Sequence, residues 1–262
     1  LPLLSQPNLQ QQLVEIGYQG KKLEELEALS TAEKANMLFI VQDPYTSYYD
    51  AKVVRDFVAL TQKLGFNPIL LPFKPNGKAM HIKGFLTRFS KTAKTQAEFL
   101  NRVAKLNVPL VGVDPAIVLS YRDEYKEALG DSRGDFHVLT AHEWLTNQLE
   151  SNTLQSAVKN IAKSDRTFEW HLFPHCTEST FMPNSPKEWQ NIFAQFGQTL
   201  NVEKVGCCGM AGVFGHEVQN QTMSKDIYDV SWGKKLQGKD PNYCLATGYS
   251  CRSQVKRYEK AI

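Results

Sequence analysis

The sequence predicts an α/β fold in which two related lobes of parallel, Rossmann-like βαβ units follow a short helical lead-in. Short apolar runs of strand length alternate with longer stretches whose apolar residues recur at helical spacing, as in a parallel sheet with crossover helices. Turn residues punctuate these stretches: Gly65 follows a helical pattern, and 74–78 reads Lys-Pro-Asn-Gly-Lys. Loops in the two halves recur at matched distances, which indicates an internal duplication.

The composition excludes several classes of protein. Hydrophobic residues make up 42% and charged residues 22% of the 262 positions, so the chain is neither disordered nor of low complexity. Its 30 basic and 27 acidic side chains nearly cancel, and we expect no nucleic-acid partner. No apolar stretch reaches the roughly 18 residues that cross a bilayer, so we expect no transmembrane segment and a cytoplasmic protein, free or peripheral to the inner membrane. The first residue is Leu1 rather than Met, which indicates a piece of a longer protein.

Residues 1–36 are expected to form a helical lead-in that links to an upstream domain, since their helical spacing is interrupted by Gly17 and Gly20. The first lobe is expected over 37–165. Its strands are predicted at 37–41, 68–71, 109–113 and 136–139, with a loop at 42–50 and helices at 53–64, 85–106 and 142–149.

The second lobe is expected over 166–262. Its strands are predicted at 168–173, 202–205 and 242–247, and its helices at 189–200, 223–236 and 251–260. Its loop spacing repeats that of the first lobe, because Tyr45 and Gly77 are 32 residues apart, as are Cys176 and Cys208. The two lobes are therefore predicted to share one βαβ order, with cysteines in the second alone.

All five cysteines lie in the last third of the chain, four of them in loops that follow predicted strands. These four are Cys176, Cys207, Cys208 and Cys251. Ligands of parallel α/β units collect at the carboxyl ends of the strands, so we expect the four thiols to converge. Four thiolates suit an iron–sulfur cluster or a tetrahedral zinc ion, and the spacing does not separate the two. A redox dithiol or a vicinal disulfide at the adjacent pair is an alternative.

Three further residues belong to the candidate site. His175, next to Cys176, is expected to bind the cofactor as a hydrogen-bond donor to a sulfur. Gly209 lets the backbone approach a bulky group. Cys244 falls inside a predicted strand, where a buried structural thiol is expected, and it is a reserve ligand should Cys251 point away.

Two polar groups lie outside the cysteine loops. The first is a basic loop with Lys74, Lys78, His81 and Lys83. The second is a group of mixed charge with Asp114, Arg122, Asp123 and Glu124. The basic loop is expected to be solvated or to bind an anion, and the second group to form buried ion pairs. No Ser-His-Asp arrangement or phosphate loop accompanies them, so no catalytic residue is predicted in this chain.

The cysteine pattern resembles the cysteine-rich CCG domain that occurs in heterodisulfide reductase and in the iron–sulfur component of glycolate oxidase. Cys176 is followed after thirty residues by Cys207-Cys208-Gly209 and later by Cys251. In that family two motifs occur in tandem, each ending in a Cys-x-x-Cys pair. Gly248 stands at the first position of the final pair, and Tyr45, Asn76 and Asp114 lie near the cysteine positions of the first repeat.

A second resemblance covers nearly the whole chain and is to the C-terminal region of large bacterial FAD-linked oxidases. It rests on the segments 41–50, 74–78, 113–116 and 121–125. Those proteins are fused D-lactate or D-2-hydroxyglutarate dehydrogenases with an FAD domain and ferredoxin-type clusters in one polypeptide. The resemblance implies that FAD and the hydroxyacid site lie outside this chain.

Three functions remain open at this point. The first is an electron-transfer module that holds an iron–sulfur cluster, of the 4Fe–4S type by resemblance, and relays electrons from the flavin towards a quinone or another acceptor. The second is a docking domain, either stapled by zinc or free of metal. The third is a thiol-based reductase similar to heterodisulfide reductase.

Overall fold

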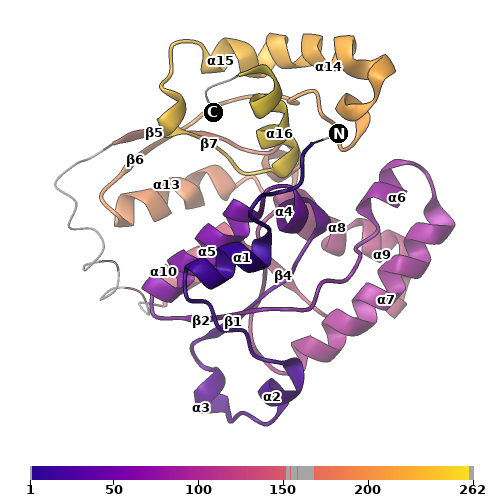
Figure 1. The fold of residues 1–262 in the computed structure, drawn as a ribbon, viewed down its shortest axis with the longest axis vertical. Helices are drawn as coiled ribbons and strands as arrows, with labels where there is room; N and C mark the ends of the chain where they lie inside the picture. The colour runs from indigo at the N-terminus through magenta and orange to yellow at the C-terminus, as the bar shows by residue number, and fades with distance from the viewer. Residues whose placement is uncertain (1, 152–153, 155–157, 159–167, 260–262) are drawn as a thin grey trace. The chain divides into compact units, whose positions relative to one another are not determined.

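The computed structural model describes residues 2–151, 154, 158 and 168–259 and divides into two units (Figure 1). The N-terminal unit is Pro2–Trp144, and the C-terminal unit is Leu145–Ile262. Each unit contains its own parallel sheet, so the chain is α/β, as the sequence predicts. The lobe boundary predicted at 165/166 lies outside the described residues.

The sheet of the N-terminal unit has the strand order β2-β1-β3-β4, and all its neighbouring strands are parallel. Its strands are β1 (Met37–Ile40), β2 (Asn67–Leu70), β3 (Leu110–Gly112) and β4 (Val138–Thr140). Each lies within two residues of a strand predicted from the sequence. The chain runs from β1 to one neighbour and then crosses to the other, so the gap between β1 and β3 is the switch point of this sheet.

Helices cover both faces of this sheet, with α7, α8 and α9 on one side and α5 and α10 on the other (Figure 1). The helices after β1 are α4 (Pro44–Tyr48), α5 (Ala51–Lys63), α6 (Lys78–Ile82), α7 (Leu86–Ala104), α8 (Pro115–Arg122), α9 (Glu124–Leu129), η1 (Gly130–Arg133) and α10 (Ala141–Glu150). The prediction of a loop over 42–50 was wrong for 44–48, because Asp43 caps a short helix there through Tyr45 N and Thr46 N.

The core of the N-terminal unit follows from helical spacing. Phe89, Ala93, Ala97 and Leu100 of α7 are buried at intervals of three and four residues and pack in one cluster with Phe39 of β1. Burial of such a stripe supplies most of the stability of an amphipathic helix.

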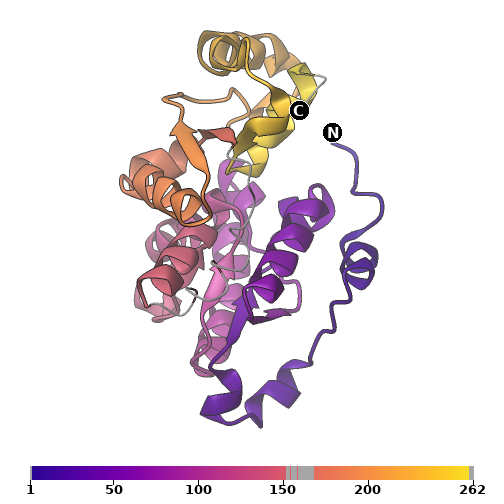
Figure 2. The ribbon, with the colours of Figure 1, turned by 90° about the vertical axis from the view of Figure 1, so that its left-hand side faces the viewer.

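The lead-in contributes to the N-terminal unit. It contains α1 (Leu9–Glu15), α2 (Leu23–Glu27) and α3 (Thr31–Lys34). Helix α1 packs against α5 (Figure 2), and Leu23 and Leu26 of α2 are buried in the same core cluster as β1. Leu9, Leu13, Leu23 and Leu26 of this segment are therefore buried residues of the unit.

The C-terminal unit has a three-stranded parallel sheet of order β6-β5-β7. Its strands are β5 (Glu169–Phe173), β6 (Thr199–Val202) and β7 (Cys244–Ala246). Its helices are α12 (Cys176–Phe181), α13 (Ser185–Gln195), η2 (Phe214–His216), η3 (Val218–Asn220), α14 (Gln221–Tyr228), η4 (Asp229–Gly233), α15 (Lys234–Leu236), η5 (Pro241–Tyr243) and α16 (Tyr249–Tyr258).

One strand of the C-terminal unit lies earlier than predicted. The sequence predicts a strand at 202–205, whereas β6 is Thr199–Val202. Gly197 has a φ of 68°, a left-handed conformation that ends the preceding helix before Leu200. Leu200 is therefore a buried strand residue opposite Trp170, and its assignment to the helical stripe was wrong.

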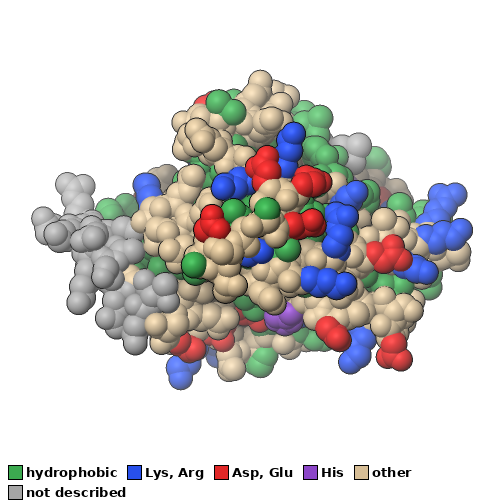
Figure 3. Space-filling view, turned by 90° about the horizontal axis from the view of Figure 1, so that it is seen from below, with side chains coloured by type: hydrophobic (Ala, Val, Ile, Leu, Met, Phe, Trp, Pro, Cys, Tyr) green, Lys and Arg blue, Asp and Glu red, His purple; other side chains and the backbone are tan. Residues whose placement is uncertain are grey.

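The surface agrees with the balanced composition. On the face drawn in Figure 3, basic and acidic side chains are interspersed. In the described part of the chain, no helix is both long and apolar enough to cross a membrane.

Candidate functional site

The switch point of the C-terminal sheet lies between β5 and β7, because the chain leaves β5 for β6 on one side and returns to β7 on the other. Cys176 begins α12 directly beyond β5, and Cys251 lies in the first turn of α16 beyond β7. Cys207 and Cys208 lie in the loop that follows β6. The four predicted cysteines thus follow the carboxyl ends of all three strands.

The four thiols contact one another in a chain. Cys207 hydrogen-bonds Cys176 and Cys208, and Cys208 also hydrogen-bonds Cys251. Cys208 and Cys251 are 2% and 1% exposed, whereas Cys176 and Cys207 are half-buried. The structure therefore brings together four residues that are up to 75 positions apart in the sequence.

Cys207 is the sulfur on which hydrogen bonds converge. The thiols of Cys176 and Cys208 lower its pKa far below the usual range, and the N–H groups of Gly209 and Ala211 lower it further. The Gly209 nitrogen lies 3.3 Å from Cys207 Sγ. The pKa values of Cys176 and Cys208 are raised, first of all because their thiols donate to Cys207, and then by burial. The hydrogen bonds to Cys207 thus favour its thiolate form over its thiol form.

Cys207 also faces a shallow depression of about 380 Å³. Its lining consists of Gly206, Cys207, Asp226, Ile227, Val230 and Ser231. Gly206 N donates to Ser231 Oγ at 2.7 Å, and Trp232 Nε1 donates to Gly206 O at 3.0 Å, which fixes the loop against η4. The Cys207 sulfur is thus accessible from one side, whereas Cys208 and Cys251 are buried.

Gly209 is required by close packing. Its φ is +85°, and a Cβ atom there would lie 2.1 Å from the carbonyl oxygen of Ser224. Ser224 Oγ donates to Gly209 O at 2.7 Å. The glycine lets the cysteine loop lie directly on α14. The approach of this backbone to a bulky cofactor, which the sequence predicts, stays a prediction.

His175 occupies the space beside Gly248. Its Nδ1 accepts from Thr177 N at 3.2 Å as the cap of α12, and its Nε2 lies 3.1 Å from Ser250 Oγ. A Cβ atom at Gly248 would lie 2.3 Å from His175 Cδ2. The imidazole therefore fills the volume where the resembling family has a further cysteine, and its hydrogen bonds go to α12 and α16.

A buried carboxylate that the sequence analysis missed anchors these loops. Glu178 is 0% exposed and accepts from Ser185 Oγ, Thr247 Oγ1 and, at 3.1 Å, Trp189 Nε1. Thr247 Oγ1 in turn accepts from His175 N at 2.9 Å. In the sequence, the signal for Glu178 was its position three residues after His175, the residue that caps α12.

Cys244 lies apart from the four thiols. It begins β7 opposite His171 of β5, towards the amino ends of the strands. Its Sγ donates to Asp240 O at 3.5 Å, and burial raises its pKa. Of the two candidates for the last position, Cys251 is the one placed with the other sulfurs.

The donor set suits a soft metal, because it consists of four thiols with one stabilised thiolate. The sulfurs form a line of contacts, however. Over residues 2–151, 154, 158 and 168–259, no three Cys, His, Asp or Glu side chains surround a common metal position. Binding a cluster would require the thiol side chains to turn away from one another. The residues fit such a group in number and chemistry, and Cys207 gives it a side open to solvent.

The two polar groups that the sequence analysis singled out in the N-terminal unit form ion pairs and a helix cap. The basic group is not a loop throughout, because Lys78 and His81 lie in α6. Lys78 pairs with Glu124, and Arg122 pairs with Glu143. Asp114 is 3% exposed and caps α8 through Ala116 N and Ile117 N. The predicted network is therefore two separate ion pairs and a helix cap.

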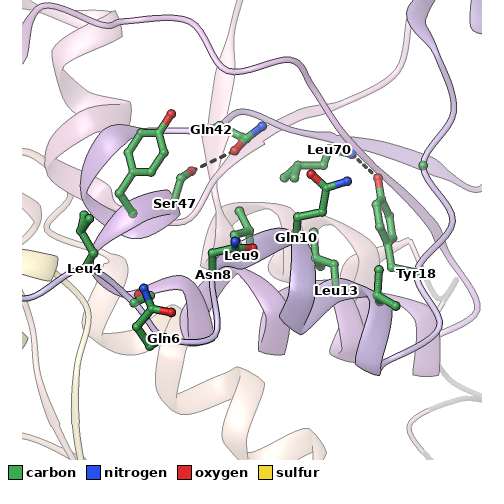
Figure 4. Close-up of a pocket in the computed structure, with 14 residues that line it drawn as sticks. Leu4, Gln6, Asn8, Leu9, Gln10, Leu13, Tyr18, Gln42, Ser47 and Leu70 are labelled. Carbon is green, nitrogen blue, oxygen red and sulfur yellow. Dashed lines mark hydrogen bonds between the residues drawn. The ribbon is translucent and has the colours of Figure 1, made fainter.

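The N-terminal unit also contains a groove of about 660 Å³ between the lead-in and the carboxyl ends of β1 and β2 (Figure 4). Tyr18 Oη accepts from Leu70 N at 2.7 Å, and Ser47 Oγ donates to Gln42 Oε1 at 3.0 Å along its wall. Its described lining is neutral and contains no thiol or imidazole.

No protein-family model matches the chain. It is 81% identical over 262 residues to D-2-hydroxyglutarate dehydrogenase from Haemophilus influenzae, covering all of this chain and 26% of that protein. It is 57% identical over 259 residues to D-2-hydroxyglutarate dehydrogenase from Escherichia coli, covering 99% of this chain and 25% of that protein. The chain thus spans about a quarter of the length of these oxidoreductases.

A more distant relative has a different name. The chain is 25% identical over 188 residues to one component of the anaerobic glycerol-3-phosphate dehydrogenase from Escherichia coli, covering 70% of this chain and 46% of that component. The shared region therefore occurs in dehydrogenases named for two different substrates.

Proposed function

We propose that this chain is an electron-transfer module in an FAD-linked D-2-hydroxyacid dehydrogenase, where it holds an iron–sulfur centre through Cys176, Cys207, Cys208 and Cys251. D-2-hydroxyglutarate is the substrate that the relatives' name suggests, with D-lactate as the alternative. FAD and ferredoxin-type clusters belong to other parts of the whole protein. The chain corresponds to its C-terminal part, and the electrons leave for a quinone or a similar acceptor.

The convergence of four thiols on one sheet edge carries the proposal. Iron–sulfur clusters are held by cysteine thiolates and stabilised by N–H groups that hydrogen-bond their sulfurs. The N–H groups of Gly209 and Ala211 already point at Cys207 Sγ. No nucleophile–base pair competes with this interpretation among the site residues described above.

The relatives support the same interpretation. A region shared by dehydrogenases named for different substrates suits a step common to both reactions, which is the transfer of electrons away from the oxidised substrate. Recognition of each substrate would then belong to parts that they do not share.

In this mechanism the group, when bound, accepts and releases one electron at a time. The chain's own residues bury two of its ligands, Cys208 and Cys251, and expose one edge at Cys207. His175 holds α12 to α16 through Thr177 and Ser250. Burial and the N–H groups at Cys207 would set the reduction potential.

The test is metal and sulfide analysis of the full-length protein after anaerobic purification. We expect broad visible absorption and stoichiometric iron and acid-labile sulfide. Cys207→Ser and Cys251→Ser should each lose the cluster assigned to this chain, whereas the matched variant Cys244→Ser should keep it.

Because ferredoxin-type clusters elsewhere also contain iron, the comparison between variants decides the outcome. Equal iron and sulfide contents in Cys207→Ser, Cys251→Ser and the unmodified protein would contradict the proposal.

A docking domain is the second candidate, and two observations favour it. His175 fills the space at Gly248, and the thiols do not surround a metal position in the described residues. In that case the purified protein would contain one zinc ion or no metal at this site, and removal of the zinc would lower its stability without changing its absorption.

A further inference from the structure

The switch point of the N-terminal sheet holds two carboxylates. Asp43 follows β1 and caps α4, and Asp114 follows the neighbouring β3 and caps α8. They are 2% and 3% exposed. These positions match those of His175 and Gly248 in the other unit, which follow β5 and β7 and precede α12 and α16.

The two carboxylates lie close enough for their charges to interact. Burial and then the charge of Asp114 raise the pKa of Asp43 to about 6, although hydrogen bonds from Thr46 and the N–H group of Tyr45 oppose this. Two negative charges that are buried close together repel each other, and their burial costs free energy unless a positive charge compensates them.

Polar side chains with unused hydrogen-bonding atoms face the same place. Tyr121 is fully buried, and the charge of Asp43 raises the pKa of its hydroxyl, after the larger effect of burial. The amides of Gln96 and Asn76 reach the same hydroxyl. Among the residues that the structure describes, Tyr121 Oη, Gln96 Oε1 and Asn76 Nδ2 nevertheless have no partner at hydrogen-bond geometry.

Unpaired polar atoms in a sealed interior are costly, so a group that satisfies them is expected there. Asp43, Asp114, Gln96 and Tyr121 are all buried, so we consider only a single ion or a few waters as the occupant. The site carries negative charge, and the atoms that could bind an ion there are carboxylate, amide and hydroxyl oxygens.

We propose that the N-terminal unit binds one hard divalent cation between Asp43 and Asp114, with Gln96 Oε1 and Tyr121 Oη as neutral oxygen ligands. Hard cations such as Ca²⁺ and Mg²⁺ prefer this set of oxygens. The first 175 residues contain no cysteine, so no thiol competes for a softer metal. Asn76 Nδ2, as a donor, would hydrogen-bond a water that completes the coordination.

Cation binding to the 262-residue chain tests this site. After treatment with EDTA and exchange into choline chloride, CaCl₂ and MgCl₂ are titrated separately, followed by the thermal unfolding midpoint and by equilibrium dialysis. We expect one bound cation per chain and a saturable rise in the midpoint with at least one of the two ions.

Three variants identify the ligands. Asp43→Asn and Asp114→Asn keep an oxygen that can cap the helix but should weaken binding by about tenfold or more. Tyr121→Phe removes one neutral ligand and should weaken it less. The control Asp56→Asn makes the same charge change on the exposed surface of α5 and should bind as the unmodified chain does.

The outcomes separate a cation from a dry carboxylate pair. The proposal is wrong if no ion binds stoichiometrically to the unmodified chain, or if Asp43→Asn and Asp56→Asn bind the ion equally well. Either result would be expected if the two carboxylates share a proton or if only waters lie between them. Cys207→Ser should leave Ca²⁺ and Mg²⁺ binding unchanged, so the result is independent of the proposed iron–sulfur site.

Discussion

At the scale of single residues, the cysteine site depends on two glycines and one histidine as much as on the thiols. Gly209 allows the loop to lie on Ser224, and Gly248 allows the His175 ring to lie between α12 and α16. Neither role involves chemistry at a cofactor. Both are steric conditions that let residues from three loops share one small volume.

Gly248→Ala should destabilise the C-terminal unit by about 1–3 kcal/mol. Its φ of −95° allows any residue, but the added Cβ would meet His175 Cδ2. Urea unfolding should therefore show a much smaller cost of the same change in a His175→Ala background. Equal costs in both backgrounds would show that this contact is not the cause, and Gly20→Ala, where the nearest atom is 3.6 Å away, is the matched control.

At the scale of elements, the site is held by ties between helices that follow different strands. Glu178 of α12 receives hydrogen bonds from α13 and from the loop before α16. In the N-terminal unit, Arg122 at the end of α8 donates to Val138 O of β4 and to Glu143 of α10. Each tie fixes a loop that leads away from a strand.

Glu178→Ala should lower the free energy of unfolding by about 3 kcal/mol or more, because it leaves several buried donors without an acceptor at roughly 1–3 kcal/mol each. Glu178→Gln keeps one acceptor oxygen and should cost less than half as much. Chemical denaturation measures both. Similar losses for the two variants would mean that the charge, and not the hydrogen bonds, stabilises this region.

Glu143→Gln should lower stability at neutral pH and have less effect in acid. Burial alone would raise the pKa of Glu143, but hydrogen bonds from Arg122 and Thr140 outweigh it and lower the pKa below 4.5. The folded state therefore binds the proton more weakly than the unfolded state. The stabilisation is present above pH 4.5 and disappears as the pH falls through the folded-state value.

The measurement is denaturant unfolding of both proteins between neutral pH and the acid limit of folding. The difference between them should shrink towards low pH. A difference independent of pH would contradict the ion-pair explanation, and Asp56→Asn, in an exposed pair, should change little at any pH.

At the scale of the whole molecule, the proposed function makes this chain one part of a longer reaction path. It spans about a quarter of the dehydrogenases it resembles, and its groove and sheet edges offer no nucleophile–base pair among the residues discussed above. The proposed division of labour places oxidation of the hydroxyacid at FAD and relay of electrons at the cysteines.

In the full-length protein, Cys207→Ser should leave reduction of the flavin by D-2-hydroxyglutarate unchanged and slow its reoxidation by a quinone at least about tenfold. Stopped-flow absorption separates the two half-reactions. Cys244→Ser should affect neither. Normal reoxidation in Cys207→Ser would mean that electrons leave by a route that does not include this site.

Local sequence features predicted most of the architecture. The apolar run of β1 and the stripe of α7 are set by neighbouring residues, so their positions agree with the prediction. The helix α4 was missed because it has only five residues, too few to show helical spacing, and it depends on the cap by Asp43. The start of β6 was missed because the stripe of α13 continues by coincidence into Leu200.

The sequence by itself determined that strands and helices alternate and that four cysteines follow strand ends, because both depend on short-range periodicity and spacing. Only the tertiary structure decided which thiols meet. Cys251 rather than Cys244 joins the others, His175 fills the space at Gly248, and Asp43 approaches Asp114. These outcomes depend on strand register and on packing between segments far apart in the chain, which no local pattern encodes.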